Sequence, residues 1–298
     1  MKKLSSYLPS LLISVIIVFG FIGMAAVILL DINVTANNCI SISKKNALEK
    51  GIYSELESYY KDKYNSSGIP AEVYMDAISE NYIKSFEEVY INAAFETLNT
   101  GEKMEIEFPE NKQLEDSIEK FFSDYADKSG YEKDEAYELK LSSTKENAYK
   151  TIGSYCDVYK FSALNEHGVL IKLSKLFRYR FALTIALALA DIVLLLLLFF
   201  INIKNKLVLY YWVGISAIIS SILGATPALY LIITRYFDSF SIKQPQVFTA
   251  YTKVMYNFTE AFIAVETAMI VLGISMLVIY AVMCGKSRRF NISPQQVK

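Results

Sequence analysis

Two carboxyl side chains, Asp191 and Glu266, lie deep inside long apolar stretches of this sequence. A charge at the centre of a bilayer costs at least about 2.5–3.5 kcal/mol on insertion scales, so such a residue usually faces protein or water. Thr226 and Thr267 are placed to join the carboxyls in one intramembrane polar cluster. We predict a cation or proton site there, or a socket for a partner's basic side chain. The alternative is two protonated carboxyls that are hydrogen-bonded to neighbouring hydroxyls.

A proline in the third apolar stretch bears on the shape of that cluster. Pro227 has no backbone N–H, so it leaves the carbonyl of Leu223 without its helical partner and favours a helix kink. Gly20 and Gly23 in the first apolar stretch are small enough to let another helix approach closely. The sequence therefore predicts a polar cluster around a kinked third helix.

Four apolar segments are long enough to hold these residues within a membrane. The hydrocarbon core is about 30 Å thick, and a helix crosses it with roughly 20 apolar residues. We expect an all-α membrane protein, with four transmembrane helices and a mainly helical extracytoplasmic domain between the first and the second. The predicted transmembrane helices are residues 10–30, 181–203, 207–234 and 259–284.

Basic residues near the segment ends indicate the orientation. Lys2 and Lys3 precede the first segment, which is longer than the roughly 7–15-residue core of a cleaved signal peptide and so predicts an uncleaved anchor. Because basic flanks tend to stay inside, we predict a multi-pass plasma-membrane protein with both termini in the cytoplasm. The expected cytoplasmic parts are residues 1–9, 204–206 and 285–298, and the expected extracytoplasmic parts are residues 31–180 and 235–258.

The charge is divided between two parts of the chain. Between Asp31 and Ile171 lie 27 of the 31 acidic and 15 of the 30 basic residues, so this segment carries a net charge of −12. The rest of the chain has 15 basic and 4 acidic residues and carries +11. An acidic segment of this length can bury a core of its own. This segment contains no arginine and many Lys, Asn, Ile and Tyr residues, a composition typical of an AT-rich bacterial genome. The sequence shows no broad basic face, so we expect no nucleic-acid partner.

Apolar residues of the acidic domain recur at helical spacing and predict a small helical bundle. Residues 104–108 alternate between apolar and acidic, which indicates a short strand or an extended link. Thirteen tyrosines fall in this domain, and such rings usually form a core. A bundle too small to bury every ring would leave an aromatic and acidic surface for a cationic peptide or a partner protein. The predicted helices lie near residues 52–64, 73–98, 114–125 and 143–161.

Two cysteines flank the acidic domain, and both lie on the expected outer side of the membrane, where a disulfide can persist. A bond between Cys39 and Cys156 would tie the two ends of the domain together and could add at most about 4–5 kcal/mol by loop-closure entropy. The alternative is two unpaired, small apolar side chains. Cys284 lies at the expected inner edge and is predicted to be a packing residue.

A basic segment precedes the second transmembrane helix, with cations at Lys172, Lys175, Arg178 and Arg180. Neighbouring apolar residues at helical spacing suggest one apolar face, so the segment is predicted to be amphipathic. It is either a collar that contacts anionic lipid headgroups or a lever that passes motion of the domain into the membrane. The apolar residues of the predicted face are Val169, Leu170, Leu173, Leu176 and Phe177.

No catalytic motif accompanies these features. The single histidine, His167, excludes a multi-histidine zinc centre, and no nucleophile elbow or phosphate loop occurs. The acidic run from Glu132 to Glu138 lacks the calcium-loop spacing and predicts a solvated helix face. We therefore expect no enzyme, no cofactor and no metal site.

The function expected is that of a membrane protein whose extracytoplasmic helical domain binds a partner or ligand, as an accessory protein, a sensor or a complex subunit. The expected partners are the lipid bilayer and either another protein or a second copy of the chain. The alternative is a transport or channel subunit that uses Asp191 and Glu266.

Overall fold

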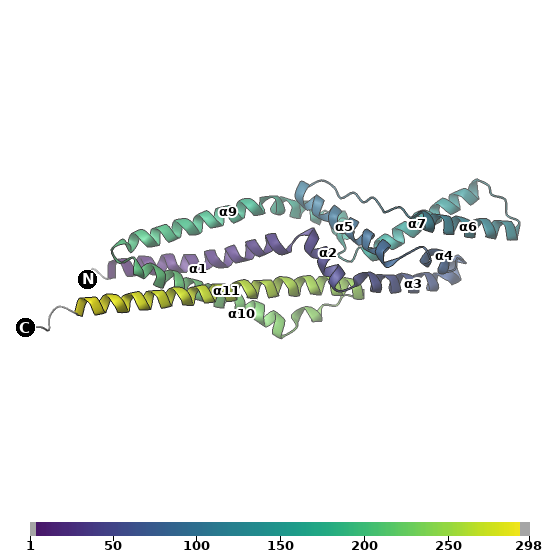
Figure 1. Ribbon diagram of the computed structural model, residues 1–298. Helices are drawn as coiled ribbons and strands as arrows, with labels where there is room; N and C mark the ends of the chain where they lie inside the picture. The colour runs from purple at the N-terminus through teal and green to yellow at the C-terminus, as the bar shows by residue number, and fades with distance from the viewer. Residues whose placement is uncertain (1–3, 293–298) are drawn as a thin grey trace, which may run out of the picture. The chain divides into compact units, whose positions relative to one another are not determined.

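The protein is all-helical, as predicted. The computed structural model describes residues 4–292, and no strand occurs within that range (Figure 1). Residues 1–3 and 293–298, which include Lys2 and Lys3, lie outside the described part. The chain divides into two compact units. The apolar unit comprises Met1–Val34, Tyr179–Ser239 and Met255–Lys298, and the polar unit comprises Thr35–Arg178 and Phe240–Val254.

Four helices are long and apolar enough to cross a membrane, which confirms the four predicted apolar helices. Three of them extend beyond the predicted apolar run at one end or both, because hydropathy locates the apolar residues and not the helix ends, whereas α10 agrees with the predicted run to within one residue. They are α1 (Leu4–Asn33), α9 (Val169–Ile201), α10 (Leu207–Ile233) and α11 (Pro245–Ile292).

The connections between these helices contain more helix than expected. Residues 204 and 205 belong to a single 3-10 turn, η1 (Ile203–Asn205), and residue 206 is the C-cap of that turn. Most of the loop expected at residues 235–258 is helical, because it contains η2 (Tyr236–Ser239) and, after five non-helical residues, the first turns of α11. The α11 helix begins at Pro245, whose fixed φ angle suits the first position of a helix.

Small and polar residues join α10 to its neighbours in the apolar unit. The hydroxyls of Ser14 and Ser216 lie 2.6 Å apart and link α1 to α10. On α10, Gly214 packs against Gly273 of α11 so closely that a β-carbon on either would meet the other's carbonyl at 2.8–2.9 Å. Lipid gives helices no hydrophobic reason to associate, so close packing and interhelical hydrogen bonds hold such a bundle together.

The polar unit contains seven complete helices of its own. Their ends are capped by side chains and glycines: Ser79, Asn111 and Asp134 each accept an N-cap hydrogen bond. Gly68 and Gly101 follow helices in the left-handed conformation, with φ near 69° and 79°. The helices are α2 (Ala36–Lys45), α3 (Leu48–Ser67), α4 (Glu72–Met75), α5 (Glu80–Thr100), α6 (Lys112–Ser129), α7 (Glu135–Cys156) and α8 (Phe161–Glu166).

The core of the polar unit explains why residues 104–108 are an extended link and not a strand. Met104 is buried, and the ring of Phe108 stacks on Phe86 with centroids 5.5 Å apart.

The first turns of α11 also belong to this unit. Gln246 packs on Gly51, and the Tyr251 hydroxyl donates a hydrogen bond of 2.6 Å to the carbonyl of Tyr159.

Candidate functional site

The carboxyl of Asp191 lies on α9 and packs directly against α1. A β-carbon on Gly20 would overlap Oδ1 of Asp191, so this carboxyl occupies the space that the glycine leaves. At Gly23, one turn further along α1, the nearest side-chain atom to such a β-carbon would be Leu187 Cδ1 at 3.9 Å. Asp191 is therefore a helix-packing residue that requires a glycine opposite it.

Glu266 makes the same kind of contact between a different pair of helices. Its Oε1 would lie 2.6 Å from a β-carbon on Gly224 of α10. This atom is buried and has no hydrogen-bond partner among the described residues. The hydroxyl of Ser221 donates a hydrogen bond of 2.8 Å to the carbonyl of Ala217 in its own helix.

The two threonines of the predicted cluster do not join these carboxyls. Thr226 and Thr267 are exposed, and each donates to the carbonyl four residues earlier in its own helix, at 2.6 and 2.7 Å. A threonine in an apolar helix can satisfy its hydroxyl locally in this way, so it needs no partner across the bundle. Pro227 is exposed as well, and α10 continues through it to Ile233.

The structure thus separates the four residues into two carboxyl–glycine contacts and two exposed threonines. The polar residues that do face one another were missed by sequence reasoning. Asn202 donates to Ser10 at 2.8 Å, and Ser14 meets Ser216. For the packing of α10 against α11, a repeating stripe of small residues on α10 was the available signal, since its three- and four-residue spacing marks one helix face. The stripe consists of Gly214, Ala217, Ser221 and Gly224.

Cys39 and Cys156 are free thiols, so the alternative of two unpaired side chains describes the structure. Both are buried in the polar unit. The hydroxyl of Tyr159 donates a hydrogen bond of 3.1 Å to the carbonyl of Cys39 and joins the end of the α7 region to α2 without a disulfide. Burial raises the pKa of the Cys39 thiol to about 12 and also raises that of Cys156. Both thiols therefore stay protonated at neutral pH. The third cysteine, Cys284, is free and partly buried.

The basic segment is the beginning of α9. Lys172, Lys175 and Arg178 are exposed. Arg180 differs from them, because its Nε pairs with Oδ1 of Asp31 on α1 at 3.3 Å. Three of the four predicted surface cations are therefore exposed, and the fourth joins two helices of the apolar unit.

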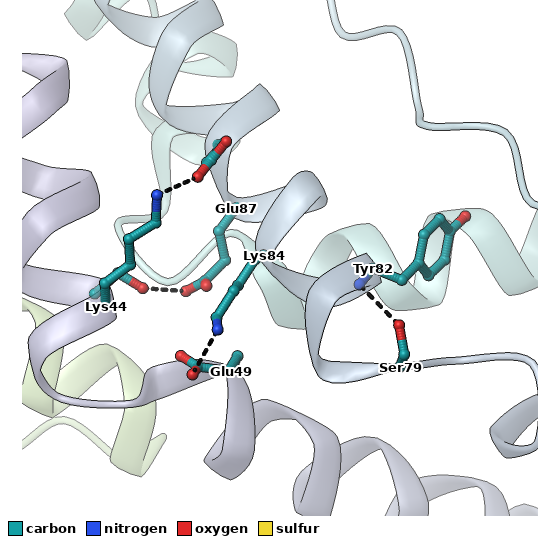
Figure 2. A network of polar contacts seen from close by, with 8 residues as sticks. Lys44, Glu49, Ser79, Tyr82, Lys84 and Glu87 are labelled. Atoms are coloured by element: carbon teal, nitrogen blue, oxygen red, sulfur yellow. Dashed lines mark hydrogen bonds and ion pairs between the residues drawn. The ribbon is translucent and has the colours of Figure 1, made fainter.

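A buried carboxyl network joins α2, α3 and α5 in the polar unit (Figure 2). Glu87 is 2% exposed and accepts a hydrogen bond of 2.9 Å from the hydroxyl of Ser43. Lys84 pairs with the buried Glu49 at 3.2 Å. Desolvation raises the pKa of Glu87 to about 7, and the hydrogen bond from Ser43 opposes this rise. Sequence reasoning missed this network, because its members are spaced as ordinary surface charges.

An open cleft of about 430 Å³ lies between α6 and α7 and combines aromatic with acidic side chains. Tyr125 and Tyr131 line it, are 57% and 64% exposed, and stack with their ring centroids 6.1 Å apart. The charged side chains that line the same cleft are Glu132, Asp134 and Lys140, and Phe122 and Tyr137 add further aromatic rings. The volume lies in the range of ligand sites.

Charges around the cleft favour a positively charged ligand. Residues 121–140 contain six acidic and three basic residues, a net charge of −3. One of the three cations, Lys133, is paired with Asp127 at 3.1 Å. The acidic side chains of the run from Glu132 to Glu138 are exposed, but only Glu135 and Glu138 lie on the predicted helix, because α7 begins at Glu135. No group of three metal-ligating side chains occurs among residues 4–292.

Comparison with known proteins finds no matching family model, no matching curated protein and no matching solved structure. We therefore infer function from the geometry of the chain's own side chains.

Proposed function

We propose that this chain is a multi-pass plasma-membrane protein that binds a partner through the α6–α7 cleft of its polar unit. In this proposal the polar unit is extracytoplasmic, both termini are cytoplasmic, and the four apolar helices anchor the protein. It acts as an accessory protein, a sensor or a subunit of a larger complex. The single observation that carries the proposal is the exposed tyrosine pair, Tyr125 and Tyr131, beside the carboxyls of Glu132 and Asp134.

The chemistry of the cleft favours a cationic segment of a protein or peptide. A lysine or arginine over an aromatic face gains about 0.5–1 kcal/mol at an exposed site, and more when it is desolvated. The carboxylates of Glu132 and Asp134 add attraction from a distance, which speeds encounter more than it strengthens binding. Exposed tyrosines also lose little conformational entropy on binding, because the side chain has two rotatable bonds.

The first test is the composition and mass of the particle extracted from native membranes in lipid nanodiscs. We expect a second protein with the wild-type chain, and at least a tenfold loss of it with Tyr125→Ala/Tyr131→Ala. Tyr64→Ala is the matched control, because Tyr64 is 51% exposed but lies outside the cleft. A particle that contains this chain alone, or equal loss of the partner in the control, would refute the proposal.

The orientation has a separate test. Ser129→Cys in the polar unit should react with a membrane-impermeant maleimide in intact cells, whereas Asn205→Cys should react only after permeabilisation. Both positions are exposed, so access to them depends on the side of the membrane. The opposite pattern would place the polar unit in the cytoplasm.

A second candidate function is a transport or channel subunit. The observation that favours it is the buried Oε1 of Glu266, which has no hydrogen-bond partner among the described residues and could meet a proton or cation during transport. In proteoliposomes, Asp191→Asn/Glu266→Gln would then abolish ion or proton flux without changing the mass of the particle. Flux that is unchanged in this variant, or absent from the wild type, would remove this candidate.

A further inference from the structure

The beginning of α9 presents two different faces within the same three turns. Leu170 and Ser174 are each 1% exposed, and Phe177 packs edge-on to Phe95 of α5 with centroids 6.2 Å apart. These three residues follow the spacing of one helix face, and that face packs into the polar unit. The predicted apolar face is therefore divided: Leu170 and Phe177 lie on the packed side, whereas Leu173 and Leu176 are exposed.

The opposite face mixes long cations with exposed apolar side chains. At 100° per residue, Lys172, Lys175, Leu176 and Tyr179 share this face. Leu176 is 73% exposed and Tyr179 is 71% exposed. Exposed leucine and tyrosine beside lysines are typical of a surface that meets the boundary between lipid headgroups and acyl chains.

The length of α9 places this face at that boundary. The helix has 33 residues, so it is about 50 Å long, whereas the hydrocarbon core is about 30 Å thick. Residues from Phe181 to Ile201 are apolar except for Asp191 and Thr184 and suffice to cross the core. The remaining residues, 169–180, extend for about 18 Å and lie at the depth of the headgroups and just beyond them.

We propose that the exposed face of α9 between Lys172 and Tyr179 binds the phosphate headgroups of anionic phospholipids. Lys172 and Lys175 supply the positive charge of this face, and Leu176 and Tyr179 contact the upper acyl chains. Arg178 adds charge from the edge of the face, where its guanidinium packs beside Gly101. The apolar residues of the segment continue directly into the apolar part of α9, and this continuity supports a lipid over an acidic protein. This inference is independent of the α6–α7 cleft.

The test compares lipid retention by the full chain in nanodiscs that contain phosphatidylcholine with rising fractions of phosphatidylglycerol. Lipids that remain after delipidation in mild detergent are counted by mass spectrometry. We expect the wild type to be enriched in phosphatidylglycerol, and Lys172→Gln/Lys175→Gln/Arg178→Gln to lose this enrichment, by roughly fivefold for each charge at low salt. The enrichment should also fall as salt rises, because exposed charges are screened.

The matched control is Lys112→Gln/Lys120→Gln/Lys128→Gln on α6, which removes the same charge from exposed positions of the polar unit. It should retain the wild-type enrichment. Soluble glycerol phosphate is added as a competitor to separate a headgroup held within a bilayer from a free phosphate. Wild-type protein without enrichment at any lipid fraction would overturn the proposal and indicate an acidic protein partner. Displacement of the lipid by millimolar glycerol phosphate would overturn it in favour of a free-phosphate site. The wild-type titration keeps the test decisive even if the triple variant misfolds.

Discussion

The hydroxyl of Ser43 donates a 2.9 Å hydrogen bond to Oε1 of Glu87, a carboxyl that is almost wholly buried. Desolvation raises the pKa of Glu87 from its ordinary 4.5 to about 7. Between these two values the folded protein holds a proton that the unfolded chain has released. The stabilisation that protonated Glu87 contributes to the folded protein is therefore fully present below pH 4.5. It is lost as pH rises through 7, which lowers the free energy of unfolding by up to roughly 3 kcal/mol.

Glu87→Gln should remove this loss, because the neutral amide has no proton to release. We expect the variant to be more stable than the wild type at pH 8 and similar to it at pH 5, as measured by denaturant titration across this range. Ser43→Ala should extend the loss of stability to higher pH and increase its total, because it removes the hydrogen bond that lowers the pKa of Glu87. Equal slopes in the wild type and Glu87→Gln would show that other groups control the pH dependence.

Gly20→Ala should destabilise the apolar unit, since its β-carbon would overlap the carboxyl of Asp191. Overpacking of this kind typically costs about 1–3 kcal/mol. Gly23→Ala is the control one turn away, where the new β-carbon would meet Leu187 at 3.9 Å, an ordinary contact. Thermal unfolding in detergent should show a lower midpoint for Gly20→Ala alone. Similar midpoints for both variants would mean that Asp191 moves aside freely.

Gly273→Ala should be worse tolerated than Gly20→Ala, because the obstacle is backbone. Its β-carbon would lie 2.8 Å from the carbonyl oxygen of Gly214, and a carbonyl in a helix cannot rotate away. We therefore expect α10 and α11 to separate, with a loss of about 2 kcal/mol or more. Gly285→Ala, with open space around its β-carbon, should leave the unfolding midpoint unchanged or raise it. An unaffected midpoint in Gly273→Ala would contradict the close crossing.

The two buried cysteines should be almost inert in the folded protein. The thiolate is the reactive form, and burial holds the pKa of Cys39 near 12 and raises that of Cys156. Maleimide labelling followed by peptide mass spectrometry should modify both only after denaturation, without prior reduction. A requirement for a reductant would show that the two form a disulfide after all.

Hydropathy and turn signals predicted much of this architecture, for reasons that act locally. Lipid demands continuous apolar runs, so the four membrane-length helices could be read directly. Residues such as Ser79 and Gly68 mark helix ends through contacts a few residues away. The α11 helix begins before the apolar run that was predicted to span the membrane, and Pro245 is a sequence signal for that earlier beginning.

The pairing of helices could not be predicted in the same way, because it depends on contacts far apart in the sequence. Nothing local indicates that Asp191 faces Gly20 and Glu266 faces Gly224. The same limit hid the bond between Ser43 and Glu87, which joins residues of two different helices. The aromatic cleft was foreseen only as a class of surface, since the rings that a small bundle leaves exposed depend on its packing.

The serine contact between α1 and α10 has a consequence for how the chain is made. Ser14 and Ser216 are separated by 202 residues. A ribosome that adds about 5–20 residues per second needs roughly 10–40 s to synthesise that interval. During this time α1 is already inserted while its partner helix does not yet exist, so the hydroxyls of Ser10 and Ser14 must be sheltered by the insertion machinery or by their own helix backbone. Until Asn202 and Ser216 have been synthesised, α1 therefore lacks the polar partners that it has in the folded protein.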